Sequence, residues 1–77
     1  MKISICLRLF ATLAKHLPEN AEDYSVEQGI TVQDLVKKLS IPEKEAKLIF
    51  INSRKAELSS VLHHGDQVGI FPPIGGG

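Results

Sequence analysis

The chain has 77 residues, of which 43% are hydrophobic and 23% are charged, a composition typical of one small folded domain rather than of a disordered segment. Nine basic and nine acidic residues cancel, so no net charge attracts the chain to nucleic acid or to a membrane, and we expect neither as a partner. Because it has a single cysteine and no apolar stretch as long as a signal peptide or a transmembrane helix, we expect the chain to act in the cytoplasm.

Residues 2–10 are predicted to form a β-strand, because apolar side chains alternate with others along them. The apolar face consists of Ile3, Ile5, Leu7 and Leu9. Cys6 lies on the opposite face with no His or Cys at ligand spacing, so we interpret it as a packing residue rather than a nucleophile. Residues 11–17 predict a short apolar link with one helical turn, and residues 23–27 predict a second, weaker strand.

The clearest helix is predicted to follow Thr31, which suits the N-cap position. Asp34 stands three residues later, where a capping box places its acidic side chain. Apolar side chains then recur at helical spacing, namely Val32, Leu35, Val36 and Leu39. Pro42 is expected to open a further short turn over residues 43–46.

Three strands are predicted in the second half of the chain. Residues 48–52 are almost continuously apolar, the pattern of a strand buried on both faces. A brief strand is expected at residues 55–57, and a last strand at residues 67–72 follows a tight turn. The pair Pro72-Pro73 ends this last strand, because neither proline can donate a hydrogen bond to a neighbouring strand.

This order of elements, a pair of strands followed by a crossover helix and further strands, predicts an α+β fold of the β-grasp, or ubiquitin-like, type. We expect a mixed sheet of four to five strands with one main helix packed across it. Residues 1–73 are expected to form this domain, and residues 74–77 a flexible glycine tail.

Charge is distributed unevenly along the chain. Residues 19–34 contain five acidic side chains and no Lys or Arg, whereas residues 37–55 contain six basic side chains and two acidic ones. We interpret these segments as two solvated faces, and docking on a charged partner is the alternative.

No constellation typical of an enzyme is found in the sequence. The one cluster of Ser, His and Asp lies in a single turn region and consists of Ser59, Ser60, His63, His64 and Asp66. Adjacent histidines in a Gly-Asp turn usually point apart into solvent, and a metal or catalytic site needs more ligands or an orienting partner. We therefore expect no metal, no bound cofactor and no enzymatic activity of the chain alone.

The sequence closes on Gly75, Gly76 and Gly77, a tail without side chains that can enter a channel too narrow for larger residues. The reactive group expected there is the carboxylate of Gly77, which is a poor electrophile until it is converted to an acyl-adenylate. A sulfur or nitrogen nucleophile can then displace AMP. The pair Pro72-Pro73 can direct the tail stiffly away from the sheet. A frayed end or a cloning remnant is the alternative interpretation.

Several motifs resemble those of the MoaD/ThiS family of sulfur carriers, and in particular the small subunit of molybdopterin synthase. Residues 65–77 resemble the family's ending, in which a Gly-Asp turn leads to a strand ending Phe-Pro-Pro and to a terminal Gly-Gly. Residues 7–11 resemble its Arg-Tyr-Phe-Ala pattern, with Leu9 in place of the aromatic residue. Residues 29–35 resemble its Gly-x-Thr-Val-x-Asp-Leu helix opening, and residues 50–52 its Val-Asn strand end.

The resemblance implies a sulfur carrier whose Gly77 becomes a thiocarboxylate. It implies three partners: a ubiquitin-activator-like adenylating enzyme that uses ATP, a sulfurtransferase, and the large subunit of molybdopterin synthase. Gly76 and Gly75 would lie in the partner's channel, and Gly75 departs from the Ala or Ser that the family often has there. The residues expected to dock on partners are Phe71, Pro72 and Pro73.

Other functions stay open at this point. The Phe-Pro-Pro ending and the long first loop, residues 11–20, favour the molybdopterin pathway over the thiamine pathway, and a tungsten–pterin pathway would look the same. A second class is a ubiquitin-like protein modifier, joined to target lysines through Gly77. A third class is a plain ubiquitin-like binding module, for which the tail would be incidental.

Overall fold

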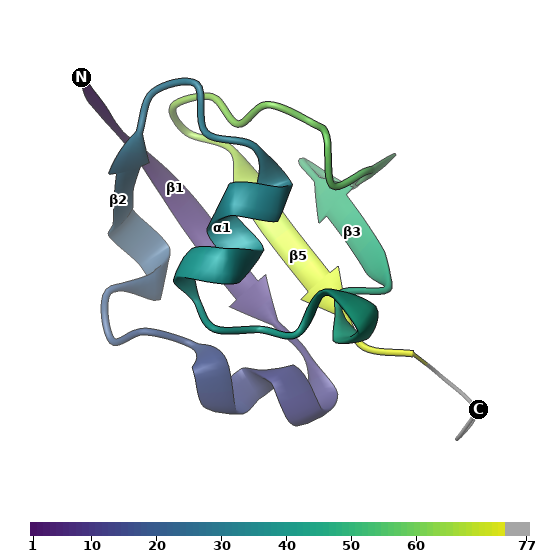
Figure 1. The fold of residues 1–77 in the computed structure, drawn as a ribbon. Helices are drawn as coiled ribbons and strands as arrows, with labels where there is room; N and C mark the ends of the chain where they lie inside the picture. Colours follow the sequence, from purple (N-terminus) through teal and green to yellow (C-terminus); the bar gives the residue numbers. More distant parts are fainter. Residues whose placement is uncertain (74–77) are drawn as a thin grey trace.

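One mixed sheet and one helix organise residues 1–73, the part of the chain that the computed structural model describes. The five strands stand in the order β2-β1-β5-β3-β4, and α1 crosses one face of the sheet (Figure 1). The bounds are β1 Lys2–Leu9, β2 Tyr24–Glu27, α1 Val32–Lys38, β3 Leu48–Ile51, β4 Arg54–Ala56 and β5 Gln67–Phe71. This arrangement confirms the predicted β-grasp fold. The predicted tail over residues 74–77 lies outside the described residues.

The centre of the sheet is the parallel pair of β1 and β5, in which Leu7 stands beside Val68. Antiparallel strands flank this pair: β2 is joined to β1, and β3 lies between β5 and β4. A parallel pair needs a long crossover connection, and that connection includes α1. Figure 1 shows β1 and β5 running side by side behind the helix.

The helix α1 begins as its sequence predicts. The Thr31 hydroxyl accepts a hydrogen bond from the Asp34 backbone N–H, and the Asp34 carboxylate accepts one from the Thr31 N–H, each at 3.3 Å. This reciprocal pair is a capping box. None of the helices in residues 1–73 combines the length and the hydropathy that a membrane crossing requires.

Short 3₁₀ helices occupy two of the connections that the sequence marks as turns. Ala11–His16 and Ala21–Asp23 fill the long link between β1 and β2, and Glu43–Glu45 follows Pro42. Leu13, in the first of them, is fully buried. The link after β1 therefore closes one end of the core.

The core lies between the sheet and α1. It contains one face of β1, the inner face of the helix, and side chains from β3 and β5. Its fully buried large side chains are Ile5, Leu13, Val26, Val32, Leu35, Val36, Leu62, Val68 and Ile70. The alternation predicted for β1 is confirmed, because Ile5, Leu7 and Leu9 are all buried.

The prediction that residues 48–52 form a strand buried on both faces is wrong. Within β3 only Ile49 is buried, whereas Leu48, Phe50 and Ile51 are half-buried. The reason is that α1 covers one face of the sheet only, so Leu48 and Phe50 lie on the uncovered face. The apolar run of this strand therefore contributes side chains both to the core and to the uncovered face of the sheet.

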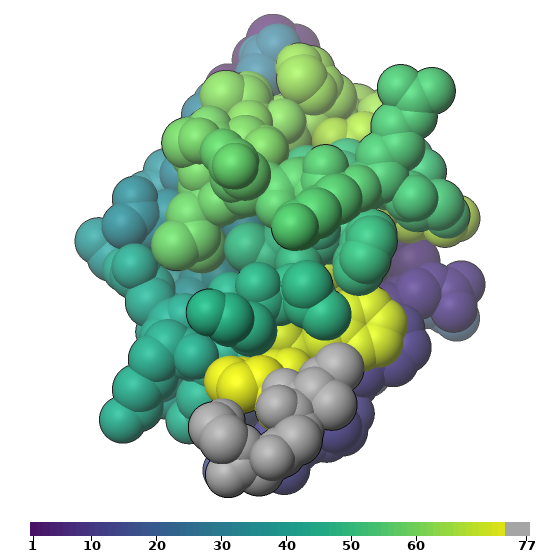
Figure 2. Space-filling view, turned by 90° about the vertical axis from the view of Figure 1, so that its right-hand side faces the viewer, coloured from purple at the N-terminus to yellow at the C-terminus, as the bar shows by residue number. Residues whose placement is uncertain are grey.

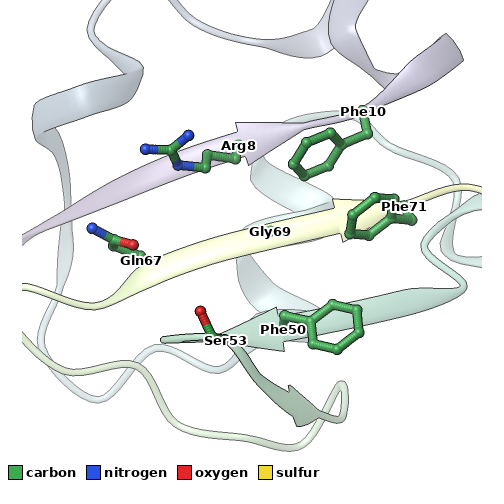
Figure 3. Close-up of a pocket in the computed structure, with 7 residues that line it drawn as sticks. All are labelled: Arg8, Phe10, Phe50, Ser53, Gln67, Gly69 and Phe71. Atoms are coloured by element: carbon green, nitrogen blue, oxygen red, sulfur yellow. The ribbon is translucent and has the colours of Figure 1, made fainter.

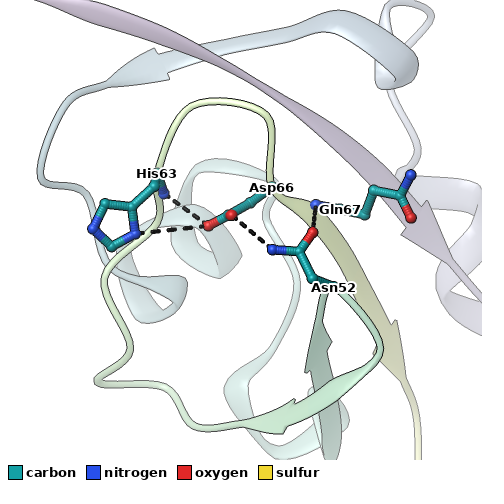
Figure 4. A network of polar contacts seen from close by, with 4 residues as sticks. All are labelled: Asn52, His63, Asp66 and Gln67. Atoms are coloured by element: carbon teal, nitrogen blue, oxygen red, sulfur yellow. Dashed lines mark hydrogen bonds and ion pairs between the residues drawn. The ribbon is translucent and has the colours of Figure 1, made fainter.

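A network of polar contacts joins the β3–β4 turn to the start of β5 (Figure 4). The Asp66 carboxylate, in a residue that is only 8% exposed, accepts hydrogen bonds from the Asn52 side-chain amide at 2.9 Å and from the His63 N–H at 2.8 Å. The side-chain oxygen of Asn52 in turn accepts a hydrogen bond from the Gln67 N–H at 2.9 Å. Two positive φ angles, 54° at Asn52 and 69° at Ser53, make the tight turn that places Asn52 there.

We expect the substitution Asp66→Asn to lower the free energy of unfolding by about 1–3 kcal/mol, because it weakens two hydrogen bonds to a buried charged acceptor. Urea unfolding followed by circular dichroism measures this change. Glu19→Gln, which neutralises an exposed carboxylate, is the matched control and should leave stability unchanged. Equal stability of the two variants would contradict a structural role for the Asp66 network.

Candidate functional site

Three phenylalanines gather on the sheet face that α1 leaves uncovered. The Phe10 and Phe71 rings are stacked, with centroids 4.1 Å apart and planes 2° from parallel. The Phe50 ring meets Phe71 edge-on, with centroids 5.8 Å apart and an interplanar angle of 84°. We call Phe10, Phe50 and Phe71 the aromatic surface. Phe10 is 37% exposed, so an apolar cluster faces solvent here.

The strand register brings these rings together. Phe71 ends β5 and stands beside Leu48 of β3, and Phe50 stands beside Gly69. Phe10 follows β1, where its N–H donates to the Ile70 carbonyl at 3.2 Å. The Phe71 carbonyl accepts from the Lys47 N–H at 3.0 Å. Hydrogen bonds from both neighbouring segments thus hold β5 up to its last residue.

The chain leaves the sheet beside the aromatic surface. In Figure 2 the last described residues, in yellow, lie at the surface between the green segment of β3 and the purple segment that follows β1. Pro72 is half-buried and Pro73 is exposed. A protein that covers the aromatic surface would therefore also meet the chain at Pro72-Pro73.

A groove of about 330 Å³ opens on the same face. Figure 3 shows the three phenylalanines at one end of the groove and polar side chains at the other, with Gly69 in between. The lining residues are Arg8, Phe10, Phe50, Ser53, Gln67, Gly69 and Phe71. The lining is mainly apolar with few polar groups, a character typical of a binding surface.

The site residues predicted from the sequence fall into two groups. The structure places Phe71 in the aromatic surface, and Pro72 and Pro73 directly after it. Their role in docking stays a prediction. Gly75, Gly76 and Gly77 lie outside the described residues, so the chemistry predicted for them also stays a prediction.

Phe10 and Phe50 belong to this surface but were not predicted from the sequence as members of it. For Phe10 a signal existed, because the alternation of the first strand places an aromatic ring on the face opposite the apolar one. For Phe50 no local signal existed, since its neighbours Ile49 and Ile51 are apolar as well. Arg8 and Gly69 were missed because their importance depends on neighbours from other strands.

Polar side chains in and near the His63–Asp66 turn make hydrogen bonds that stabilise the fold. The ring Nδ1 of His64 accepts a hydrogen bond from the Ser4 N–H at 3.0 Å, and the Ser60 hydroxyl accepts from the Glu57 N–H at 3.1 Å. The hydroxyl of Ser4 donates to Asp23. Within residues 1–73 no group of three or more His, Cys, Asp and Glu side chains is arranged to hold a metal ion.

Comparison with known proteins relates this chain to a protein family. The model of the ThiS family matches residues 7–77, a range that includes the strands beneath the aromatic surface and the three glycines. No curated protein sequence matches the chain.

Three archaeal proteins illustrate the similarity to solved structures. The HVO 2177 protein of Haloferax volcanii is 26% identical, with a TM-score of 0.76 over 99% of this chain and 88% of that chain. SAMP1 of the same organism, small archaeal modifier protein 1, is 26% identical, with a TM-score of 0.64 over 96% of this chain and 99% of that chain. A Pyrococcus furiosus protein assigned as molybdopterin converting factor, subunit 1, is 23% identical, with a TM-score of 0.63 over 94% and 99% of the two chains.

Proposed function

The chain belongs to the ThiS family, and from this membership we propose that it carries sulfur as a thiocarboxylate on Gly77. The observation that carries the proposal is the extent of the family match, which includes the domain and the terminal glycines together. An apolar surface beside the last described strand suits a carrier that other proteins bind.

The proposed chemistry takes place at the Gly77 carboxylate. An oxygen of this carboxylate attacks the α-phosphorus of ATP in an adenylating enzyme related to the ubiquitin activators, and pyrophosphate leaves. The terminal sulfur of a sulfurtransferase persulfide then attacks the acyl carbon, and AMP leaves. A second thiol cleaves the resulting acyl disulfide, which releases the Gly77 thiocarboxylate and leaves that thiol oxidised in a disulfide with the sulfurtransferase. Gly76 lets the tail pass through a narrow channel, because it has no side chain. Gly75 lies in the same channel, at a position where the family often has Ala or Ser. ATP is used by the adenylating enzyme, and the carrier itself holds no cofactor in this scheme.

The aromatic surface is the proposed docking site for the adenylating enzyme. Aromatic side chains supply most of the affinity at many protein interfaces, because burying them removes a large apolar area from water. Phe71 belongs to this surface, and Pro72 and Pro73 continue from it towards the reacting end. Docking there would place Pro72 and Pro73, from which the tail continues, against the enzyme.

We propose molybdopterin synthesis as the pathway that receives the sulfur, with the large subunit of molybdopterin synthase as the acceptor protein. The Phe71-Pro72-Pro73 ending supports this assignment. The thiamine pathway is the alternative. Mixing the thiocarboxylate with each acceptor system separates the two, because only the correct one would return Gly77 to a carboxylate and transfer the sulfur.

A second candidate function is that of a protein modifier, which the similarity to SAMP1 favours. In that case the activated Gly77 would acylate lysine side chains of other proteins. Denaturing gels of cell extract that contains labelled carrier would show larger labelled species that depend on ATP and on Gly77. If the thiocarboxylate forms but no such species appear, the result would support the sulfur-carrier function and contradict the modifier function.

The test of the proposed function is intact-mass spectrometry. The chain is incubated with the adenylating enzyme and the sulfurtransferase of the same organism, ATP and a sulfur source. We expect the mass to rise by the difference between one sulfur and one oxygen, and omission of ATP should prevent the change. An unchanged mass with enzymes that are active on ATP would overturn the proposal.

A further inference from the structure

The centre of the groove beside the aromatic surface is left open by Gly69. Gly69 pairs with Arg8 on one side and with Phe50 on the other, so the rows of side chains on β1 and β3 border a position that has none (Figure 3). A Cβ atom at Gly69 would meet Phe10 at 3.5 Å and the Arg8 carbonyl at 4.0 Å, both ordinary contacts. The fold therefore has room for a Cβ atom at this position.

The backbone of Gly69 does not require glycine either. The positive φ angles of described glycines occur at Gly29 and Gly65, and Gly69 lies within the regular strand β5. Glycine inside a strand weakens it, and often marks a place where another chain approaches closely. Here neither backbone conformation nor crowding explains the missing side chain, which points to a use of the open space.

The groove has one charged lining residue, Arg8. Among residues 1–73, the N-terminus and Lys2 pair with Glu27, and the His63 ring lies beside Asp66; none of these contacts involves Arg8. Arg8 is exposed and lies next to Gln67, at the end away from the phenylalanines (Figure 3). A ligand that fills the groove would therefore meet an apolar wall at one end and a guanidinium at the other.

We propose that this groove is a socket for one bulky apolar side chain of the adenylating enzyme, with a carboxylate of the enzyme beside it at Arg8. The inference rests on the proposed function and adds the chemistry of the partner's contact. The apolar side chain would lie over Gly69 against the aromatic surface, and the carboxylate would accept hydrogen bonds from the Arg8 guanidinium. Gly69 then determines specificity, because a larger residue excludes the partner's side chain.

The test measures adenylation of the carrier, as pyrophosphate release, with the wild type, G69A and G69V. We expect G69V to raise the KM for the carrier by about tenfold or more and to leave kcat almost unchanged, since docking is weakened while the tail is intact. G69A should have a smaller effect in the same direction. Thermal unfolding of both variants should occur at the wild-type temperature or above it, because a side chain replaces glycine in a strand.

Two further comparisons show whether the effects on the KM are specific to the groove. S25V adds the same side chain to an exposed position of β2 outside the groove and should leave the KM unchanged. R8Q should raise the KM and reduce its dependence on salt, whereas K37Q, which removes an exposed cation from α1, should do neither.

The outcomes separate this inference from the proposed function. A wild-type KM in G69V, or an unchanged KM and salt dependence in R8Q, would overturn the socket while the carrier function stands. Absence of adenylation of the wild type would overturn both. Self-association of the wild type that G69V abolishes would show that a second copy fills the groove, and this result too would overturn the socket for the enzyme.

Discussion

Addition of one alanine after Gly77 is expected to abolish thiocarboxylate formation. The added residue would remove the reacting carboxylate from Gly77 and place a methyl group in a channel that the glycine tail is proposed to fit. Incubation with the adenylating enzyme, the sulfurtransferase, ATP and a sulfur source, followed by intact-mass spectrometry, measures the result. We expect no detectable exchange of oxygen for sulfur in the extended variant.

A matched control separates the position of the carboxylate from a general sensitivity of the tail. The substitution Gly75→Ala adds the same methyl group two residues before Gly77 and keeps the chain length. We expect this variant to be converted to the thiocarboxylate, and thermal unfolding of both variants should match the wild type. Full conversion of the extended variant would contradict a reaction confined to Gly77.

Replacement of Leu35 by alanine is expected to lower the free energy of unfolding by about 2–5 kcal/mol. Leu35 is completely buried on the inner face of α1, so the shortened side chain leaves a cavity between the helix and the sheet. A domain of this size has little stability to lose, and we expect a large part of the variant to be unfolded at 37 °C. Urea unfolding followed by circular dichroism measures the loss.

The control for this prediction lies on the same helix. Lys37→Ala changes an exposed position of α1 and favours helix formation slightly, so its stability should differ from the wild type by less than about 0.5 kcal/mol. A loss below about 1 kcal/mol in Leu35→Ala would contradict close packing of α1 on the sheet.

Local patterns in the sequence were sufficient to predict the elements. The alternation of residues 2–10, the helical spacing after Thr31 and the prolines at 72 and 73 depend on neighbours within a few positions, so they can be read without the tertiary structure. The capping box of Thr31 and Asp34 was predicted and confirmed for the same reason. The order of the elements then restricted the topology to the β-grasp fold.

The incorrect prediction for β3 has a different origin. A run of apolar residues indicates burial but not which surface each side chain joins. Ile49 is buried in the core, whereas Phe50 lies on the opposite face and meets Phe71. The buried carboxylate of Asp66 was missed in the same way, because its partner Asn52 lies 14 residues earlier in the chain.

The sequence by itself determined the strands, the helix with its cap, and the likeness to sulfur carriers that led to Gly77. These features depend on residue types at short spacing. Only the tertiary structure decided which side chains form the aromatic surface. Phe10, Phe50 and Phe71 come from three separate segments, and the open position at Gly69 has meaning only beside Arg8 and Phe50. Strand register brings these residues together, and register depends on pairing between distant parts of the chain.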